Sequence, residues 1–388
     1  MKKIIYLCAM MLLCTDIMAQ IDLNDKNWGS GPVFYDNFDE ANRQFDNIFQ
    51  EPLGKWISYS KGAWPSGVTK PSTNQVYQWG NCQFDSSHET MNINCWYEPN
   101  SPIQCGSYDI GPLSGGHCDY THNELYYYSG IIETPTPMFR YGYFEIRCKL
   151  PVHKGAFPAF WLWDAEDSAH SADPHYEEID IFEYSWNIGE SPNYIGNSNP
   201  HGLPDPYTFT AGIYFDDHSS NWPHPSFARV FPTLPSGSLD LSNWHVFSCE
   251  WLPDCVKWYC DGLLVNEFYD AEHIPHRFLT LKANYAIDGK YDYNGGVWTG
   301  NDNMVVDYIR VYQLKWDCKT EEVINYQSDL DSFEYAVKKS ISIIPFENIV
   351  IDTNDKMTLR VTDSFEITGT FQIDAGAEFT VIKQKCQD

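Results

Sequence analysis

The sequence predicts an all-β protein built as a two-sheet antiparallel sandwich, and three features of the chain support this. Short runs of β-branched and aromatic residues recur from Leu125 to Tyr312, with turn residues between them. No long stretch of this region shows the 3.6-residue period of an amphipathic helix. Aromatic residues make up 16% of the chain, including 14 Trp and 26 Tyr, and such side chains favour the pleated surface of a sheet.

Residues 1–19 have the features of a secretory signal. Lys2 and Lys3 precede an apolar run from Ile4 to Leu13, and Ala19 offers a small residue for cleavage. The apolar run is too short to span a bilayer. We therefore expect no transmembrane segment and export to the periplasm, the cell surface or the medium after cleavage near Ala19.

The mature chain opens with the strand-like segment Val33–Asp39 and then loses its regular pattern. Residues 57–125 are rich in Gly, Pro, Ser and Asn, with short strands such as Met91–Asn94 between turn signals. Residues 184–208 form a second loop of similar composition. Long loops inside a compact domain are usually functional, so we expect both to border a cleft.

The segment Glu178–Glu183 contains three carboxylates, interleaved with β-branched and aromatic residues. Alternate side chains of a strand share a face, so Glu178 and Asp180 point the same way. Strict alternation would put Phe182, not Glu183, on that acidic face. We predict a β-bulge that adds one residue and brings Glu183 back beside the other acids.

Three acids on one strand face repel each other, which gives a purely structural strand no advantage. Cleavage of a glycosidic bond, in contrast, needs a pair of carboxyl groups, held about 5–5.5 Å apart when the anomeric configuration is retained. Two glutamates that lean inward can close most of the roughly 13 Å between the outer backbones. The alternative is a solvated edge strand with a charged outer face.

The acidic segment resembles the E-x-D-x-x-E active-site strand of glycoside hydrolase family 16, in the β-bulge version shared by laminarinases, agarases and porphyranases. Other segments match in the expected order and together cover about residues 32–313. They are Tyr141–Arg147, Gly155–Trp163, Trp244-His245, Glu250–Asp254, Lys257–Gly262 and Met304–Tyr312. The resemblance implies a jelly-roll, concanavalin-like sandwich and a retaining glycoside hydrolase.

The resemblance also implies roles for the three acids. Glu178 would attack the anomeric carbon and form a glycosyl-enzyme, while Glu183 would protonate the leaving oxygen and then deprotonate the incoming water. Neighbouring carboxylates favour the protonated form that Glu183 needs. Asp180 would hold Glu178 in place and tune its charge. This chemistry requires no cofactor.

Further residues match substrate-binding positions of the family. Tyr176 stands two residues before Glu178, where lichenase-like relatives place a tryptophan against the sugar. Trp161 and Trp163 share one strand face because they are two residues apart, although core packing is the alternative for each. Looser matches are Tyr214, Asn284 and Trp298.

Asp307 matches a residue that binds a structural calcium in many relatives, far from the cleft. A buried, hydrogen-bonded aspartate is the alternative. Three histidines lie near the acidic segment without metal-ligand spacing, and we interpret them as surface-loop residues: His153, His170 and His175.

Two departures from the laminarinases limit the prediction of the substrate. Laminarinases usually carry a Trp-Pro pair shortly before the acidic strand, whereas this chain has Asp173–Glu177 there, and Phe209–Asp216 lacks the histidine that they tend to have. We expect an endo-acting hydrolase of a β-linked polysaccharide, a β-1,3 or mixed-linkage glucan before a β-galactan. The alternative is a carbohydrate-binding protein on the same sandwich without catalysis.

The charge and the cysteines constrain partners and compartment. A formal net charge of -28 argues against nucleic acid and anionic membrane as partners. The partner that the resemblance implies is a polysaccharide or oligosaccharide substrate, and we expect a monomer. Two of the 12 cysteines lie in the expected signal, which leaves an even number and predicts disulfides. We expect bridges within the loop that contains Cys82, Cys95, Cys105 and Cys118.

The composition changes after Trp316. Residues 20–316 are the predicted catalytic domain, and residues 317–388 are predicted to be a polar linker, with a short helix near Ser332–Lys338, and a small β-rich appendage. Its expected strands are Ile341–Ile344, Ile349–Ile351, Met357–Val361, Phe365–Ile367, Phe371–Ile373 and Phe379–Ile382. No acid-aromatic cluster recurs in this region, so we expect it to be non-catalytic.

Overall fold

The computed structural model of this protein describes the following parts of its chain. These are residues 25–38, 55–56, 75–77, 81–85, 89–101, 103–104, 124–125, 127–153, 155–166, 175–184, 209–216, 225–230, 240–287 and 300–387. The expected signal, most of the two long loops, His170 and Trp298 lie outside these ranges.

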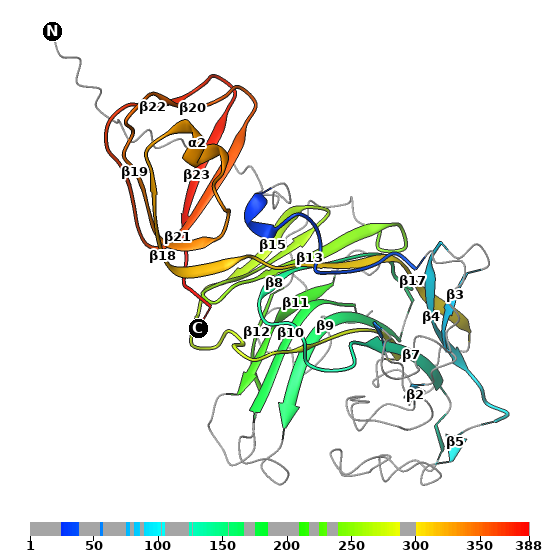
Figure 1. Cartoon of the computed structure of the whole chain (residues 1–388). Helices are drawn as coiled ribbons and strands as arrows, with labels where there is room; N and C mark the ends of the chain where they lie inside the picture. The colour runs from blue at the N-terminus through cyan, green and yellow to red at the C-terminus, as the bar shows by residue number, and fades with distance from the viewer. Residues whose placement is uncertain are drawn as a thin grey trace.

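Within the described residues, 15 strands form one hydrogen-bonded sheet that folds into two layers (Figure 1). In order, one layer contains β12 (Pro225–Val230), β11 (Thr210–Asp216), β10 (His175–Glu183), β9 (Ala156–Glu166), β16 (Thr280–Ile287) and β7 (Tyr127–Glu133). The other contains β4 (Met91–Tyr97), β17 (Asn301–Tyr312), β8 (Gly142–Lys149), β13 (His245–Trp251), β14 (Val256–Cys260) and β15 (Leu263–Phe268). The layers join where β4 pairs with β7.

Short strands complete this part of the fold. They are β1 (Phe34–Asp36) beside β17, β2 (Gln75–Tyr77) beside β7, β3 (Cys82–Phe84) beside β4, and the separate pair β5 (Ile103–Gln104) and β6 (Glu124–Leu125). All pairings here are antiparallel except that of β2 with β7. The predicted antiparallel sandwich is therefore confirmed.

The core lies between the layers and consists of alternate residues of facing strands. Fully buried members include Phe144 on β8, Ile179 on β10, Phe247 on β13 and Trp258 on β14. This packing leaves the opposite face of β10 and its neighbours for polar side chains. No described helix is long or apolar enough to cross a membrane.

The expectation of disulfides is wrong for six cysteines. Reduced, buried thiols are found at Cys82, Cys95, Cys148, Cys249, Cys255 and Cys260. Cys82 donates to the carbonyl oxygen of Ile131 at 3.5 Å, and Cys95 lies 3.3 Å from the hydroxyl of Ser129. Such thiols pack as small apolar side chains. Cys105 and Cys118 lie outside the described residues.

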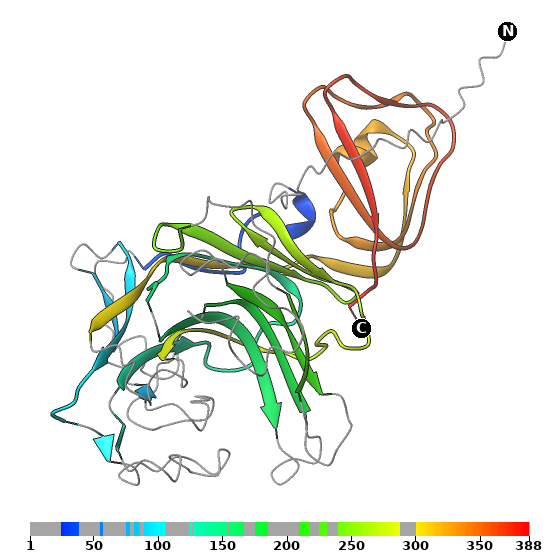
Figure 2. The ribbon, with the colours of Figure 1, turned by 180° about the vertical axis from the view of Figure 1, so that it is seen from behind.

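The C-terminal region, residues 316–387, is a small coil of parallel strands rather than a linker with an appendage, and we call it the β-coil (Figure 2). Its elements are β18 (Trp316–Ile324), α2 (Gln327–Asp331), β19 (Val337–Ile343), β20 (Ile349–Ile351), β21 (Lys356–Ile367), β22 (Phe371–Ile373) and β23 (Glu378–Lys383). Strands β18, β19, β21 and β23 pair in parallel, and so do β20 and β22. The predicted strands are found, except that Met357–Val361 and Phe365–Ile367 belong to the single strand β21. The predicted linker is wrong where β18 begins, and the helix precedes its predicted position.

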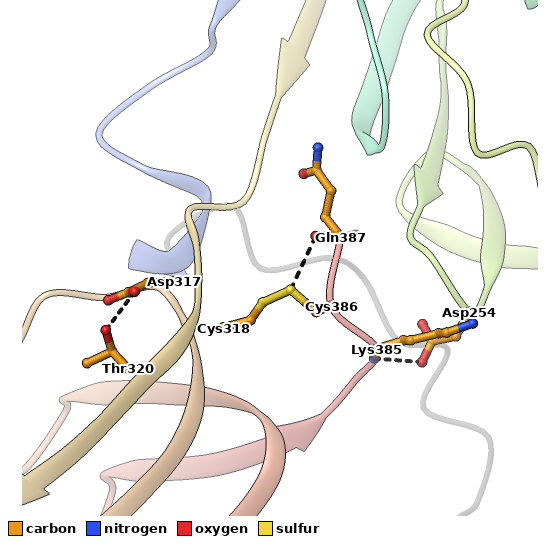
Figure 3. The surroundings of a disulfide bond; sticks show 7 residues. All are labelled: Asp254, Asp317, Cys318, Thr320, Lys385, Cys386 and Gln387. Atoms are coloured by element: carbon orange, nitrogen blue, oxygen red, sulfur yellow. Dashed lines mark hydrogen bonds between the residues drawn. A yellow bond between two sulfur atoms is a disulfide. The ribbon is translucent and has the colours of Figure 1, made fainter.

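The β-coil is fastened to the sandwich at several points. The backbone N–H of Lys385 donates to Oδ2 of Asp254, in the turn after β13, at 3.1 Å (Figure 3). Next to this contact, a disulfide between Cys318 and Cys386 closes the β-coil itself by joining β18 to the end of the chain. The 3-10 turn η1 (Lys26–Trp28) lies between the two parts, where Trp28 joins an apolar cluster with residues of both.

A buried ion pair lies at the same junction. Arg360 on β21 contacts Asp25 at 3.0 Å, with 6% and 5% of the two side chains exposed. We expect Arg360→Met to lower the free energy of unfolding by about 3–5 kcal/mol, because it leaves the Asp25 carboxylate buried without its cation. Urea denaturation measures this. The double variant Asp25→Asn/Arg360→Met should lose much less, and equal losses would contradict a buried pair.

Candidate active site

The acidic segment lies on β10 with the predicted bulge. On the β9 side, Glu178 pairs with Trp163 and Asp180 with Trp161, but Glu183 pairs with Ala159, so one extra residue lies between Asp180 and Glu183. The pairing with β11 shifts at the same place. The prediction of a β-bulge is confirmed.

The bulge changes which side chains enter the core. Ile181 and Phe182 are consecutive, yet both are buried in the apolar cluster between the layers. Glu183 therefore returns to the face that bears Glu178 and Asp180. The exposed fractions of the three acids are 8% for Glu178, 1% for Asp180 and 9% for Glu183, so they lie in a largely covered site.

A tryptophan from the opposite layer fixes the bulge. The indole Nε1 of Trp258, on β14, donates to the backbone carbonyl oxygen of Asp180 at 2.8 Å. A bulge disrupts the ladder locally, and a buried carbonyl without a donor is costly. After the bulge, the backbone N–H of Tyr184 donates to the carbonyl of Pro158 at 3.0 Å.

Cross-strand register places most of the predicted site residues on the face of the acids. One row contains Tyr214, Glu178, Trp163 and Thr280; the next contains Asp180, Trp161, Lys282 and Glu133; the third contains Glu183, Ala159 and Asn284. Tyr176 is on the same face of β10 as Glu178 because it lies two residues away. Trp298 is the predicted residue that the described part of the chain does not contain.

Hydrogen bonds link these residues to each other. The hydroxyl of Tyr176 donates to Oε2 of Glu178 at 2.5 Å. Burial, followed by the charge of Glu178, raises the pKa of Tyr176 well above its ordinary value, so this hydroxyl keeps its proton. The indole Nε1 of Trp161 donates to Oδ1 of Asn284 at 2.7 Å. Tyr176 therefore contacts the proposed nucleophile directly.

The two tryptophans of β9 are part of this site and not of the apolar core. Trp161 and Trp163 are both partly exposed, and neither belongs to the apolar cluster between the layers. Their ring centroids are 6.3 Å apart and their planes are inclined by 58°. The alternative of core packing is therefore wrong for both, and they lie on the face of the acids.

Lys282 also lies on the face of the acids, although it was not among the predicted site residues. It lies on β16 with 1% of its side chain exposed, and its ammonium contacts Glu133 on β7 at 2.8 Å. Burial lowers the pKa of Lys282, and the charge of Glu133 opposes that effect. The only sequence signal is a lysine in the otherwise uncharged strand Thr280–Ile287.

Asp307, the predicted calcium residue, is paired with a cation, and calcium binding at this position stays a prediction. The Asp307 carboxylate forms an ion pair with the guanidinium of Arg147, which already supplies a positive charge. Calcium takes six to eight oxygen ligands. Among the described residues, the group of potential ligands close enough to share an ion is His245, Cys260 and Asp261, without Asp307.

Two histidines near the site have hydrogen-bond partners. Nε2 of His153 lies 2.6 Å from the hydroxyl of Tyr285, and Nε2 of His175 lies 2.9 Å from Oδ2 of Asp164. His175 belongs to β10 itself, so its interpretation as a loop residue is wrong.

Comparisons with known proteins point to enzymes that cleave β-glucans. No protein-family model matches the chain. The endo-1,3-1,4-beta-glycanase EglC of Rhizobium meliloti (strain 1021) is 28% identical over 199 residues, which are 51% of this chain and 35% of the relative. The glucan endo-1,3-beta-glucosidase A1 of Niallia circulans is 25% identical over 285 residues, 69% of this chain and 37% of the relative.

The chain thus spans little more than a third of the length of these two relatives. A solved structure shares the fold: one of the endo-acting O-glycanases with which members of the human gut microbiota initiate mucin breakdown. It is 20% identical, has a TM-score of 0.50, and covers 73% of this chain and 91% of its own.

Proposed function

We propose that this chain, whose resemblance to the β-glucanases of glycoside hydrolase family 16 is confirmed by its relatives, is an exported, endo-acting hydrolase of a β-linked polysaccharide that retains the anomeric configuration. The observation that supports this best is the bulged strand β10, which presents Glu178, Asp180 and Glu183 on one face. Retaining hydrolysis needs a nucleophile and an acid whose carboxyl groups lie about 5–5.5 Å apart.

The surroundings of the acids support a division of roles. Glu178 accepts a hydrogen bond from Tyr176, and a hydrogen bond to the charged form of a carboxylate favours that form. An ionised Glu178 is suited to attack the anomeric carbon. Glu183, at the other end of the acidic row, would act first as the acid and then as the base. Asp180 lies between them and would hold Glu178 in position.

The aromatic residues of the same face would hold the sugar rings. Trp161 and Trp163 flank the acids on β9, and Tyr214 flanks them on β11. Flat aromatic faces suit the apolar faces of pyranose rings. A β-1,3 or mixed-linkage glucan is our first choice of substrate and a β-galactan the second.

We also propose a division of the chain. Residues 1–19 would direct export, residues 20–316 would contain the activity, and the β-coil would be a non-catalytic part fixed to the sandwich. The sandwich bears the acids, whereas the described contacts of the β-coil include η1, Tyr141 before β8 and the turn after β13.

Hydrolysis of a polysaccharide panel tests the proposed activity. The panel contains laminarin, mixed-linkage glucan, agarose, porphyran, carrageenan and mucin glycans, and product sizes distinguish endo from exo cleavage. We expect intermediate oligosaccharides from a β-glucan. Binding of a glycan by the wild-type protein without any cleavage would instead identify a carbohydrate-binding protein on the same fold.

The contact of Trp258 with the bulge predicts a variant that is stable but less active. Trp258→Phe keeps an aromatic side chain but removes the N–H donor to Asp180, which should lower the free energy of unfolding by about 1–3 kcal/mol while the protein still folds. It should also lower kcat, because the bulge sets the direction of Glu183. Denaturation and steady-state kinetics measure both.

Trp251→Phe is the matched control. Trp251 is equally buried, and its Nε1 donates to the carbonyl of Pro275 at 3.0 Å, away from the bulge. We expect a similar loss of stability with an almost unchanged kcat. Equal effects of the two variants on kcat would show that the Trp258 contact does not govern the acids.

A further inference from the structure

A buried lysine lies on the same face of the sheet as the three acids, in the row of Asp180 and separated from it by β9. Lys282 on β16 pairs with Trp161, and Trp161 pairs in turn with Asp180. On its other side, Lys282 pairs with Glu133 of β7, whose carboxylate is 2.8 Å from the ammonium. The lysine therefore lies two strands away from the acidic strand.

Two indole rings hold the ammonium in place. Nζ of Lys282 is 4.5 Å from the ring centroid of Trp163 and 5.2 Å from that of Trp161. These are the tryptophans that pair with Glu178 and Asp180. One ion pair and two cation–π contacts thus fix a positive charge next to the two tryptophans, on the strand beyond them.

Stability alone gives little reason for this arrangement. Removing two charges from water is costly, and well-packed apolar side chains are often as stabilising at such positions. Because only 1% of the Lys282 side chain is exposed, it is also covered from substrate. An effect of the lysine charge on the acids explains why a costly buried ion pair is present and why the lysine need not reach the substrate.

The charge of Lys282 interacts with Glu178. Among the charges that favour the protonated lysine, Glu133 comes first, followed by Glu178 and Asp164. The interaction is mutual, so the ammonium favours the ionised carboxylate of Glu178. Other titratable groups on this face near Glu178 include Tyr176, Asp180 and Glu183 on β10 and Tyr214 on β11. Because the charge of Asp180 opposes the ionisation of Glu178, a nearby cation offsets it.

We propose that Lys282 is a positioning residue whose ammonium, held by Glu133 and the two tryptophans, keeps Glu178 ionised at acidic pH. The inference rests on the proposed role of Glu178 as the nucleophile. It assigns the effect to the charge of Lys282 and not to its volume.

Two variants separate charge from packing. Lys282→Met/Glu133→Gln removes both members of the ion pair and leaves no lone buried charge from it, whereas Glu133→Gln keeps the cation. The readouts are the pH dependence of kcat/KM and the titration of the Glu178 carboxyl by NMR with ¹³C-labelled glutamate. Glu178→Gln identifies that resonance by its loss.

The expected shifts have opposite signs. In the double variant, the Glu178 titration and the acidic limb of kcat/KM should move to higher pH by about one unit, so kcat/KM below the limb falls about tenfold. In Glu133→Gln, the lysine is still protonated at acidic pH and has lost its counter-charge. The titration should then stay in place or move to lower pH.

Two results would overturn the inference. One is a folded double variant with an unchanged Glu178 titration, and the other is a shift to higher pH in both variants, which would indicate packing. The NMR titration does not depend on turnover. If the wild-type protein hydrolysed no glycan, the proposed function would fail while the titration would still report the effect of Lys282.

Discussion

Replacing Glu178 by alanine is expected to lower kcat by about 10⁴-fold or more, because the covalent route loses its nucleophile. The protein should stay folded and should still bind oligosaccharide, since the aromatic residues of the face are unchanged. Azide is small enough to enter the space left by the side chain. It should restore turnover and give a glycosyl azide of inverted, α configuration, because it attacks from the side on which Glu178 lies.

Glu177→Ala is the matched control for this prediction. Glu177 is the preceding glutamate on β10 and faces the other way, with its Oε2 3.4 Å from the backbone nitrogen of Arg277. We expect its kcat to change only a few-fold, without azide dependence. If Glu177→Ala were as damaging as Glu178→Ala, the assignment of the nucleophile would be wrong.

Replacing Glu183 by alanine is expected to lower kcat on polysaccharide by about 10²–10⁴-fold, the usual contribution of general acid–base catalysis. The loss arises because the leaving sugar oxygen receives no proton. An aryl glycoside with an acidic phenol needs no such proton, so its glycosylation step should slow far less. With azide, this variant should give a β-glycosyl azide, because azide replaces the activated water on the glycosyl-enzyme.

The comparison of the two leaving groups decides whether Glu183 is the acid. Its removal should also abolish the basic limb of the pH profile, since that limb reports the deprotonation of the acid. A loss of equal size on polysaccharide and aryl glycoside, with the basic limb intact, would assign the acid to another residue.

The sequence contains the local part of this site. Side chains of a strand alternate between its two faces, so the segment Glu178–Glu183 itself shows that Glu183 would lie on the opposite face from Glu178 in a regular strand. This predicts the bulge, and the register of β10 with its two neighbours confirms it. The shared face of Trp161 and Trp163 follows from the same rule. The sandwich was equally predictable, because its strands and the turns between them each have local signals.

The rest depends on contacts between distant segments. Trp258 reaches Asp180 across 78 positions, and Lys282 reaches Glu133 across 149, so neither contact has a local pattern. The buried thiols show the same limit, because composition predicts disulfides but pairing depends on the distance between Cα atoms.

The β-coil was missed for a related reason. Its short strands were predicted, but their parallel stacking depends on a repeat in which Ile349 aligns with Phe371 and Lys356 with Glu378. Asn354 and Gly376 occupy equivalent turns of that repeat, and both have positive φ.

The most direct test of the central assignment is mass spectrometry of a trapped intermediate. The Glu183→Ala variant should form a glycosyl-enzyme from an activated aryl glycoside faster than it hydrolyses it, so a rapid acid quench preserves the ester. After proteolysis, we expect the added sugar mass on Glu178 in the peptide that contains β10. A sugar on any other residue, or no adduct while products of inverted configuration accumulate, would contradict the account.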